Sequence, residues 1–157
     1  MNQVLRKMMG HGFTVLFISM CMGVGLLVSL VGGMEVIPGN IIEFAIPGDA
    51  GAWARAHVGG MLNGILVVVA ALATHLMAAP EPLQRKLAWM LPGTAYANLV
   101  FYIAAILSPN RALTFGDNHF GETSLAAVIG LLSALVFVIV SLVAVFLLAK
   151  ESFKTPS

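Results

Sequence analysis

The stretch His57-Val-Gly-Gly-Met-Leu-Asn-Gly-Ile-Leu-Val-Val-Val-Ala-Ala-Leu-Ala-Thr-His-Leu-Met-Ala78 decides the fold of this chain. It contains no Asp, Glu, Lys or Arg, and about 20 predominantly apolar residues are enough for a helix to cross a bilayer. The stretch therefore predicts a transmembrane helix with His57 at its mouth and Asn63 inside it. Because an unpartnered imidazole or amide is costly in hydrocarbon, each should have a ligand, a partner or a function.

The rest of the chain has the same character. Of 157 residues, 59% are hydrophobic and 10% are charged, and the apolar residues form long runs, which is typical of membrane proteins. Four spans are expected near residues 12–33, 57–78, 87–107 and 123–149. The predicted fold is all-α, one integral membrane domain built as a four-transmembrane-helix bundle. The net charge of +1 indicates no nucleic-acid partner.

The positive charges predict the orientation of the bundle. Most cations lie at one end of the expected spans, namely Arg6, Lys7, Arg85, Lys86, Lys150 and Lys154, whereas the other end has only Arg55 and Arg111. Cytoplasmic loops carry the excess of Lys and Arg. Both termini are therefore predicted to be cytoplasmic.

Two loops should share the outer face. Residues 34–56 form a long loop, rich in Gly and Pro but with apolar patches, and we expect it to pack as a lid. Residues 108–122 form the other outer loop. Cys21, the single cysteine, lies inside the first span and is expected to be a small buried hydrophobe.

Polar residues at matching depth predict a pocket in the outer half of the bundle. Asn63 lies about 9 Å further into its span than His57, at 1.5 Å per residue. Thr94, Asn98 and Tyr102 are spaced so that they line one face of the next span. Asn63, Asn98 and Tyr102 are expected to meet there. Interhelical hydrogen bonding by the asparagines and an aromatic-belt position for Tyr102 are alternatives.

His57 has two interpretations. It is either a helix-entry residue hydrogen-bonded to a loop, or a ligand of a metal or haem iron, which neutral imidazole commonly binds. Gly59 and Gly60 would let a planar macrocycle approach the helix. Gly60 and Gly64 form a small-xxx-small step, which indicates either a close helix crossing or room for a flat ligand.

The two cations of the outer face, Arg55 and Arg111, are candidates to pair with haem propionates. The spacing of the remaining residues matches no paired-cysteine site, HExxH motif, phosphate-binding loop or Ser-His-Asp set. A metal or cofactor is therefore the sharpest candidate that the residues indicate, beside the helix-entry interpretation of His57.

Several motifs give the chain a resemblance to a known family. They are Arg6-Lys-Met-Met-Gly-His-Gly12, Val31-Gly-Gly-Met-Glu-Val-Ile-Pro-Gly39, Ile41-Ile-Glu-Phe44, Trp53-Ala-Arg-Ala-His57, Leu62-Asn-Gly64, Phe101-Tyr102, Ser108-Pro-Asn-Arg111 and Leu113-Thr-Phe-Gly116. Together they resemble the styrene oxide isomerase family, small four-span haem proteins of bacterial styrene degradation. This resemblance implies a multi-pass protein of the bacterial inner membrane.

The resemblance also implies a site. It implies a ferric b-type haem between subunits of a homotrimer, with His57 as axial ligand and Asn63 and Tyr102 facing the substrate. Asn98 matches a family position too. Two departures leave the substrate range open, because Thr94 stands where an aspartate is expected and Tyr96 where a tryptophan is expected.

The reaction implied is a Meinwald rearrangement of a small apolar aryl epoxide, styrene oxide to phenylacetaldehyde, without net redox change. One alternative is a cytochrome b-type electron-transfer subunit, but that function normally requires two histidine ligands, and His57 is the sole histidine expected in the outer half. The other alternative is a non-catalytic membrane transport or assembly protein.

Overall fold

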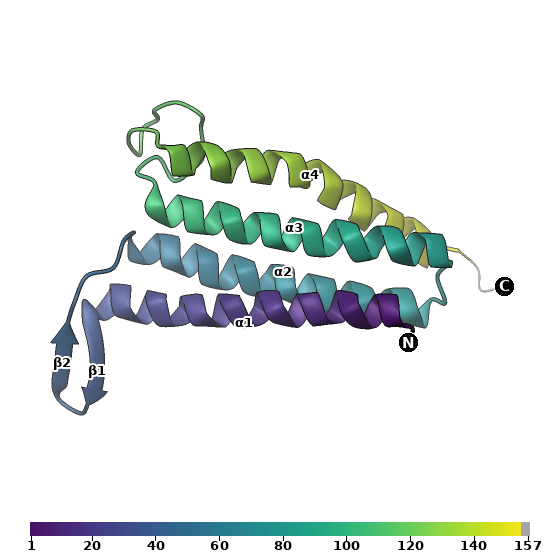
Figure 1. The fold of residues 1–157 in the computed structure, drawn as a ribbon, viewed down its shortest axis with the longest axis horizontal. Helices are drawn as coiled ribbons and strands as arrows, with labels where there is room; N and C mark the ends of the chain where they lie inside the picture. Colours follow the sequence, from purple (N-terminus) through teal and green to yellow (C-terminus); the bar gives the residue numbers. More distant parts are fainter. Residues whose placement is uncertain (155–157) are drawn as a thin grey trace.

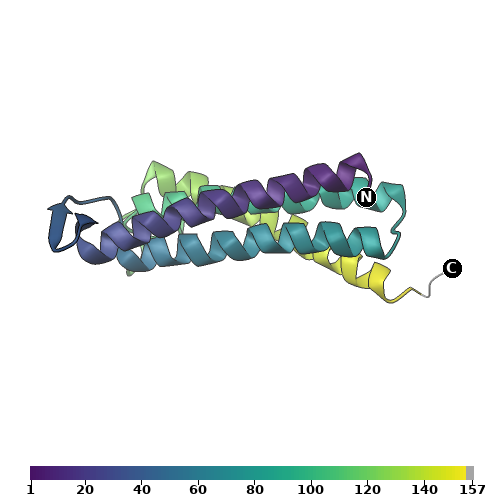
Figure 2. The same ribbon diagram turned by 90° about the horizontal axis from the view of Figure 1, so that it is seen from below.

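The structure, a computed structural model, describes residues 1–154 and consists of four long helices and one small hairpin. The elements are α1 (Gln3–Val31), β1 (Gly33–Ile37), β2 (Asn40–Glu43), α2 (Ala50–Leu76), α3 (Glu81–Leu107) and α4 (Leu125–Ser152). The helices lie side by side in chain order (Figure 1), and α4 crosses the others obliquely (Figure 2). All four are long and apolar enough to cross a membrane, which confirms the predicted helical bundle.

Helices α1, α2 and α4 each follow a polar capping residue. Helices α1 and α2 begin several residues before the apolar runs from which the sequence predicted them. Each cap accepts a backbone N–H three residues on, Asn2 from Leu5 (3.1 Å), Asp49 from Ala52 (2.6 Å) and Ser124 from Ala127 (3.1 Å). Such caps satisfy backbone donors that the first turn of a helix leaves free. Because hydropathy detects only the apolar part of a helix, the predicted starts at residues 12 and 57 fall inside α1 and α2.

Helices α1 and α2 cross closely because small residues face each other. A Cβ atom added to Gly64 would lie 2.9 Å from the carbonyl oxygen of Gly12 and 2.9 Å from the backbone nitrogen of Leu16. A Cβ atom added to Gly60 would overlap the hydroxyl of Ser19. The small-xxx-small step is therefore a helix crossing, a common use of such residues in membranes.

The loop between α1 and α2 does not form the expected lid over its own bundle. Gly32 ends α1 with a left-handed backbone (φ 75°), and an antiparallel β1–β2 hairpin follows that projects away from the helices (Figure 1). Its Val36 and Ile42 side chains are 66% and 59% exposed. Its two strands pair with each other in antiparallel register. The chain then returns to the bundle at Pro47, whose carbonyl accepts from Trp53 Nε1 (2.9 Å).

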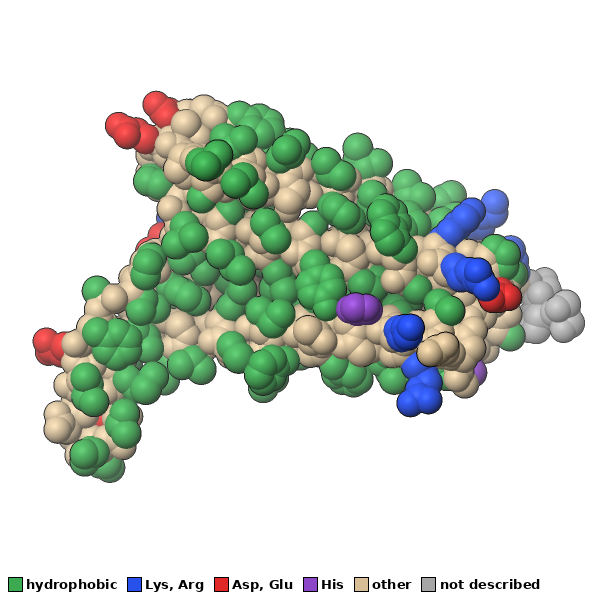
Figure 3. Space-filling view, viewed as in Figure 1, with side chains coloured by type: hydrophobic (Ala, Val, Ile, Leu, Met, Phe, Trp, Pro, Cys, Tyr) green, Lys and Arg blue, Asp and Glu red, His purple; other side chains and the backbone are tan. Residues whose placement is uncertain are grey.

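The surface matches a protein surrounded by lipid. Hydrophobic side chains cover the long faces of the helices, while Lys and Arg side chains gather at the end that holds both termini (Figure 3). Cys21 belongs to this apolar surface: it is exposed on α1, so the expectation that it is buried is wrong. Hydropathy alone did not distinguish the lipid-facing side of α1 from its packed side.

The helix crossing generates a stability prediction. Gly64→Ala places a methyl group against the backbone of α1, and overpacking of this kind costs about 1–3 kcal/mol. The matched control is Gly10→Ala, because no atom lies within 4 Å of a Cβ added there. Unfolding by SDS in mixed micelles should show a large loss for Gly64→Ala and none for Gly10→Ala. Equal stability of the two variants would contradict the close crossing.

Candidate active site

An amide hydrogen-bond chain links α2 to α3. Asn63 Nδ2 donates to the carbonyl oxygen of Gly59 (2.8 Å), and Asn98 Nδ2 donates to Asn63 Oδ1 (2.9 Å). Because a carbonyl only accepts, Asn63 must turn its amide nitrogen to Gly59 and its oxygen to Asn98. The expected meeting of the two asparagines is confirmed, and the direction of each amide is set by the chain itself.

Tyr102 reaches the same turn of α2. Its half-buried side chain lies over Gly59, where an added Cβ atom would overlap the phenolic hydroxyl. The structure thus brings Asn63, Asn98 and Tyr102 together around Gly59. The expectation that Gly59 and Gly60 leave room for a macrocycle is wrong, because Tyr102 fills the first position and Ser19 the second.

The two residues that depart from the family pattern lie outside this cluster. Thr94 is buried, and its hydroxyl donates to the carbonyl of Met90 in its own helix (2.8 Å). The Tyr96 hydroxyl is 3.0 Å from Nδ1 of His11 on α1. The sequence analysis missed this histidine–tyrosine pair, because it joins residues of two helices whose relative rotation was unknown.

His57 faces α1 rather than a loop. Its Nδ1 lies 2.8 Å from the carbonyl oxygen of Ser19, and a Cβ atom at Gly23 would lie 2.9 Å from the ring. Since a carbonyl cannot donate, Nδ1 is the donor, and Nε2 is the ring nitrogen that this contact leaves free for another partner. Histidines that bind metals are commonly held in this way, with one ring nitrogen donating to a backbone carbonyl.

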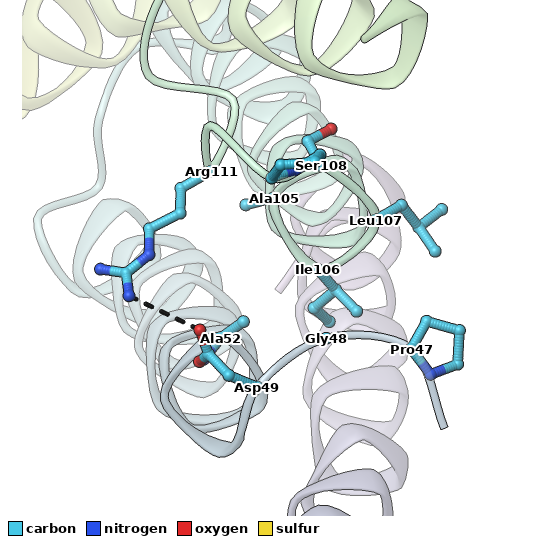
Figure 4. A pocket seen from close by; sticks show the side chains of 10 residues that line it. Pro47, Gly48, Asp49, Ala52, Ala105, Ile106, Leu107, Ser108 and Arg111 are labelled. Carbon is cyan, nitrogen blue, oxygen red and sulfur yellow. Dashed lines mark hydrogen bonds and ion pairs between the residues drawn. The ribbon is translucent and has the colours of Figure 1, made fainter. Parts of the chain in front are cut away.

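Arg55 and Arg111 meet on one carboxylate that the sequence analysis did not select. Asp49 lies 3.9 Å from the Arg55 guanidinium and 3.5 Å from that of Arg111, and the second ion pair is drawn in Figure 4. Arg111 also lies over the ring of Phe120, 4.1 Å from its centroid. An Asp directly before a helix is a capping signal, which could have marked Asp49 but not its ion pairs.

Three adjoining hollows surround these residues. The outer cavity, of about 340 Å³, lies at the ends of α2 and α3 and includes Asp49, Ser108 and Arg111 (Figure 4). The inner cavity, of about 170 Å³, is lined by Ala52, Arg55, Phe101, Tyr102, Ala105, Arg111 and Leu113. The side groove, of about 460 Å³, runs along α2 past Val58, Gly59 and Leu62 to Tyr102. Tyr102 and Arg55 line both the inner cavity and the side groove.

His57 and the polar cluster lie on different sides of α2. At about 100° per residue, Gly59 is rotated by roughly 200° from His57, and Asn63 by roughly 240°. The contacts agree with this rotation, since His57 touches α1 whereas Gly59 touches Tyr102 of α3. His57 and the Tyr102 cluster of one chain therefore face different directions.

The fold and site define a class: a four-helix membrane protein with a polar cluster and cavities in one half of an apolar bundle. Residues 4–153 match the sequence model of the styrene oxide isomerase family, and the chain belongs to that family. A styrene-oxide isomerase of Pseudomonas fluorescens is 38% identical over 150 residues, 96% of this chain and 89% of that protein. The chain is therefore an isomerase, and the electron-transfer, transport and assembly interpretations are set aside.

The packing of Tyr102 on Gly59 gives a second prediction. Gly59→Ala should displace the phenolic hydroxyl, and misplacement of a site group by about 1 Å can cost roughly 100-fold in rate. In a Tyr102→Phe background, Gly59→Ala should lower the rate by a smaller factor, because the hydroxyl is the Tyr102 atom nearest to the added Cβ atom. Steady-state kinetics with styrene oxide measure both effects. Equal losses in the two backgrounds would refute this contact as the cause, and Gly116→Ala, with no atom within 4 Å, is the control.

Proposed function

We propose that this protein is a haem-dependent isomerase that converts styrene oxide, or a related aryl epoxide, to the aryl acetaldehyde by a Meinwald rearrangement. The observation that carries the haem part of the proposal is the hydrogen bond from His57 Nδ1 to Ser19 O, which leaves Nε2 available as a ligand. Membership of the family and the 38% identical styrene-oxide isomerase support the substrate class.

The ligand inventory favours haem over a bare metal ion. Within residues 1–154, no three His, Cys, Asp or Glu side chains lie close enough together to hold a metal ion. An iron on His57 therefore requires a group that brings its own equatorial ligands, as haem b does. Arg55 and Arg111 are the cations suited to its propionates, in exchange for Asp49. When bound, the ferric group supplies a Lewis acid for the epoxide oxygen.

The placement of His57 and Tyr102 on opposite sides of α2, with Tyr102 carried by α3, supports a site shared between copies. In this arrangement His57 belongs to one copy, while Asn63, Asn98 and Tyr102 belong to its neighbour. The side groove opens along the outward face of α2 next to Tyr102, so a group held by the neighbouring copy has access to that hydroxyl. A closed ring of identical contacts satisfies this requirement, and the homotrimer that the family resemblance implies is one such ring.

The residues around Tyr102 would bind and orient the substrate. The Tyr102 hydroxyl and the second N–H of Asn98 donate to the epoxide oxygen, while Asn63 holds Asn98 in place. The benzylic C–O bond then breaks, a hydride moves from the neighbouring carbon, and the oxygen becomes the aldehyde carbonyl. Phe101, Leu113 and the alanines of the inner cavity exclude the water that would give a diol.

The size of the inner cavity suits this substrate class. Its volume is about 170 Å³, and an apolar cavity of about 150 Å³ in another protein holds benzene. A single aromatic ring with a small epoxide substituent is therefore close to the largest ligand that the cavity takes without rearrangement.

We also propose the orientation and the membrane. The termini share the end of the bundle where Lys and Arg gather (Figure 3), which supports placing both in the cytoplasm. The cluster around Tyr102 then lies in the outer half of the bacterial inner membrane.

His57 and Tyr102 should have separable effects. His57→Ala removes the proposed iron ligand, so the purified protein should lose its Soret band and its activity, whereas His75→Ala should keep both. Tyr102→Phe should keep the Soret band but lose roughly 10²–10³-fold in kcat, the usual cost of one donor to a developing oxyanion. Absorption spectra and aldehyde formation from styrene oxide measure these outcomes. A normal Soret band in His57→Ala would refute the ligand assignment.

A mixed-copy experiment tests the shared site. When His57→Ala and Tyr102→Phe chains are coexpressed, random mixing leaves about a quarter of the interfaces with both intact residues. Activity should rise well above that of either variant alone. The control is coexpression of His57→Ala with a doubly substituted chain, which restores no complete site. If the first mixture were as inactive as this control, His57 and Tyr102 would act within one chain.

A further inference from the structure

The outer and inner cavities meet at a common wall. Both are lined by Ala52 of α2, Ala105 of α3 and Arg111 of the following loop. The outer cavity lies where α2 begins and α3 ends, beside Asp49 (Figure 4). The inner cavity ends at the Tyr102 side chain. The two hollows therefore lie next to each other between Asp49 and the polar cluster, with this wall between them.

Small side chains keep this wall thin. Ala52 and Ala105 contribute only methyl groups between α2 and α3, whereas the next residue of α3, Ile106, lines the outer cavity but not the inner one. A longer side chain at residue 105 would project into the space between the cavities. Two alanines on facing helices thus set the thickness of the wall between the outer and inner cavities.

Arg111 is fixed beside this wall. Its backbone is left-handed (φ 58°), an uncommon conformation for a residue with a side chain. The fully buried Asn110 holds this turn, because its side chain donates to Thr114 O (3.0 Å) and Gly116 O (3.1 Å). With Phe120 under the guanidinium and Asp49 at its tip, Arg111 presents N–H donors at a constant place.

We propose that the outer and inner cavities form one passage for small aryl epoxides and aldehydes between the outer face and Tyr102, and that Ala105 determines the largest ring that passes. The inference rests on the proposed placement of the substrate beside Tyr102. The aromatic ring moves along the alanine wall past Arg111. Ala105 is a specificity-determining residue in this scheme, and it takes no part in the chemistry.

Cysteine labelling tests the passage without using catalysis. In a Cys21→Ser background, Ala105→Cys is compared with Val100→Cys, whose position is 43% exposed on the apolar surface of the same helix but lines none of the three hollows. The probe is a membrane-impermeant, positively charged methanethiosulfonate, added to the full-length protein in lipid nanodiscs. The cysteine at residue 105 should be labelled at least tenfold faster than the one at residue 100. Added styrene oxide or phenylacetaldehyde should slow the labelling at residue 105. Slower labelling at 105, or labelling that neither compound affects, would overturn the proposal.

Substrate size gives a second measurement. Ala105→Leu should lower kcat/KM at least tenfold more for a styrene oxide with a para methyl group than for styrene oxide itself, with an unchanged Soret band. Val100→Leu should keep the wild-type ratio of kcat/KM for the two substrates. Equal losses for both substrates in Ala105→Leu would contradict the specificity role. A failure of the haem proposal would instead show as a missing Soret band in the wild type, while the labelling result would stand unaffected.

Discussion

The close crossing of α1 and α2 is the constraint on which the site depends. Gly60 and Gly64 let α2 approach α1 so closely that a methyl group at either position meets α1 atoms. Only at this separation does the carbonyl of Ser19 come within hydrogen-bonding distance of His57. The helix packing therefore fixes which ring nitrogen of His57 carries the proton. In an apolar medium this hydrogen bond has two effects. It satisfies the Nδ1–H group of His57, and it leaves Nε2 available as a ligand.

Helix α2 also divides the functional groups between two sides. Its α1 side carries His57, and its α3 side carries Gly59 and Asn63, with Tyr102 and Asn98 packed against them. One chain thus holds a proposed iron ligand and a proposed set of hydrogen-bond donors for the epoxide oxygen, and the two face different directions. This geometry explains why so small a protein would work as an assembly, because each site would draw one half from each of two copies.

Much of the bundle and part of the site follow from the sequence. Hydropathy located four spans, and matching depths correctly predicted that Asn63 and Asn98 meet. The sequence could not show which face of each helix is packed. Cys21 was therefore wrongly predicted to be buried, and Gly59 was predicted to make room for a flat ligand, whereas Tyr102 packs over it. The hairpin and the role of Asp49 were also missed, because both depend on local backbone geometry and on loops that meet only in the folded chain.

The central claim is that His57 of one copy and Tyr102 of another face the same haem. A cryo-electron microscopy structure of the purified protein in lipid nanodiscs tests it most directly. The account predicts haem density between two copies, with His57 Nε2 of one copy at the iron and the Tyr102 hydroxyl of the next copy on the opposite face. Haem enclosed within a single chain, or density remote from His57, would contradict it.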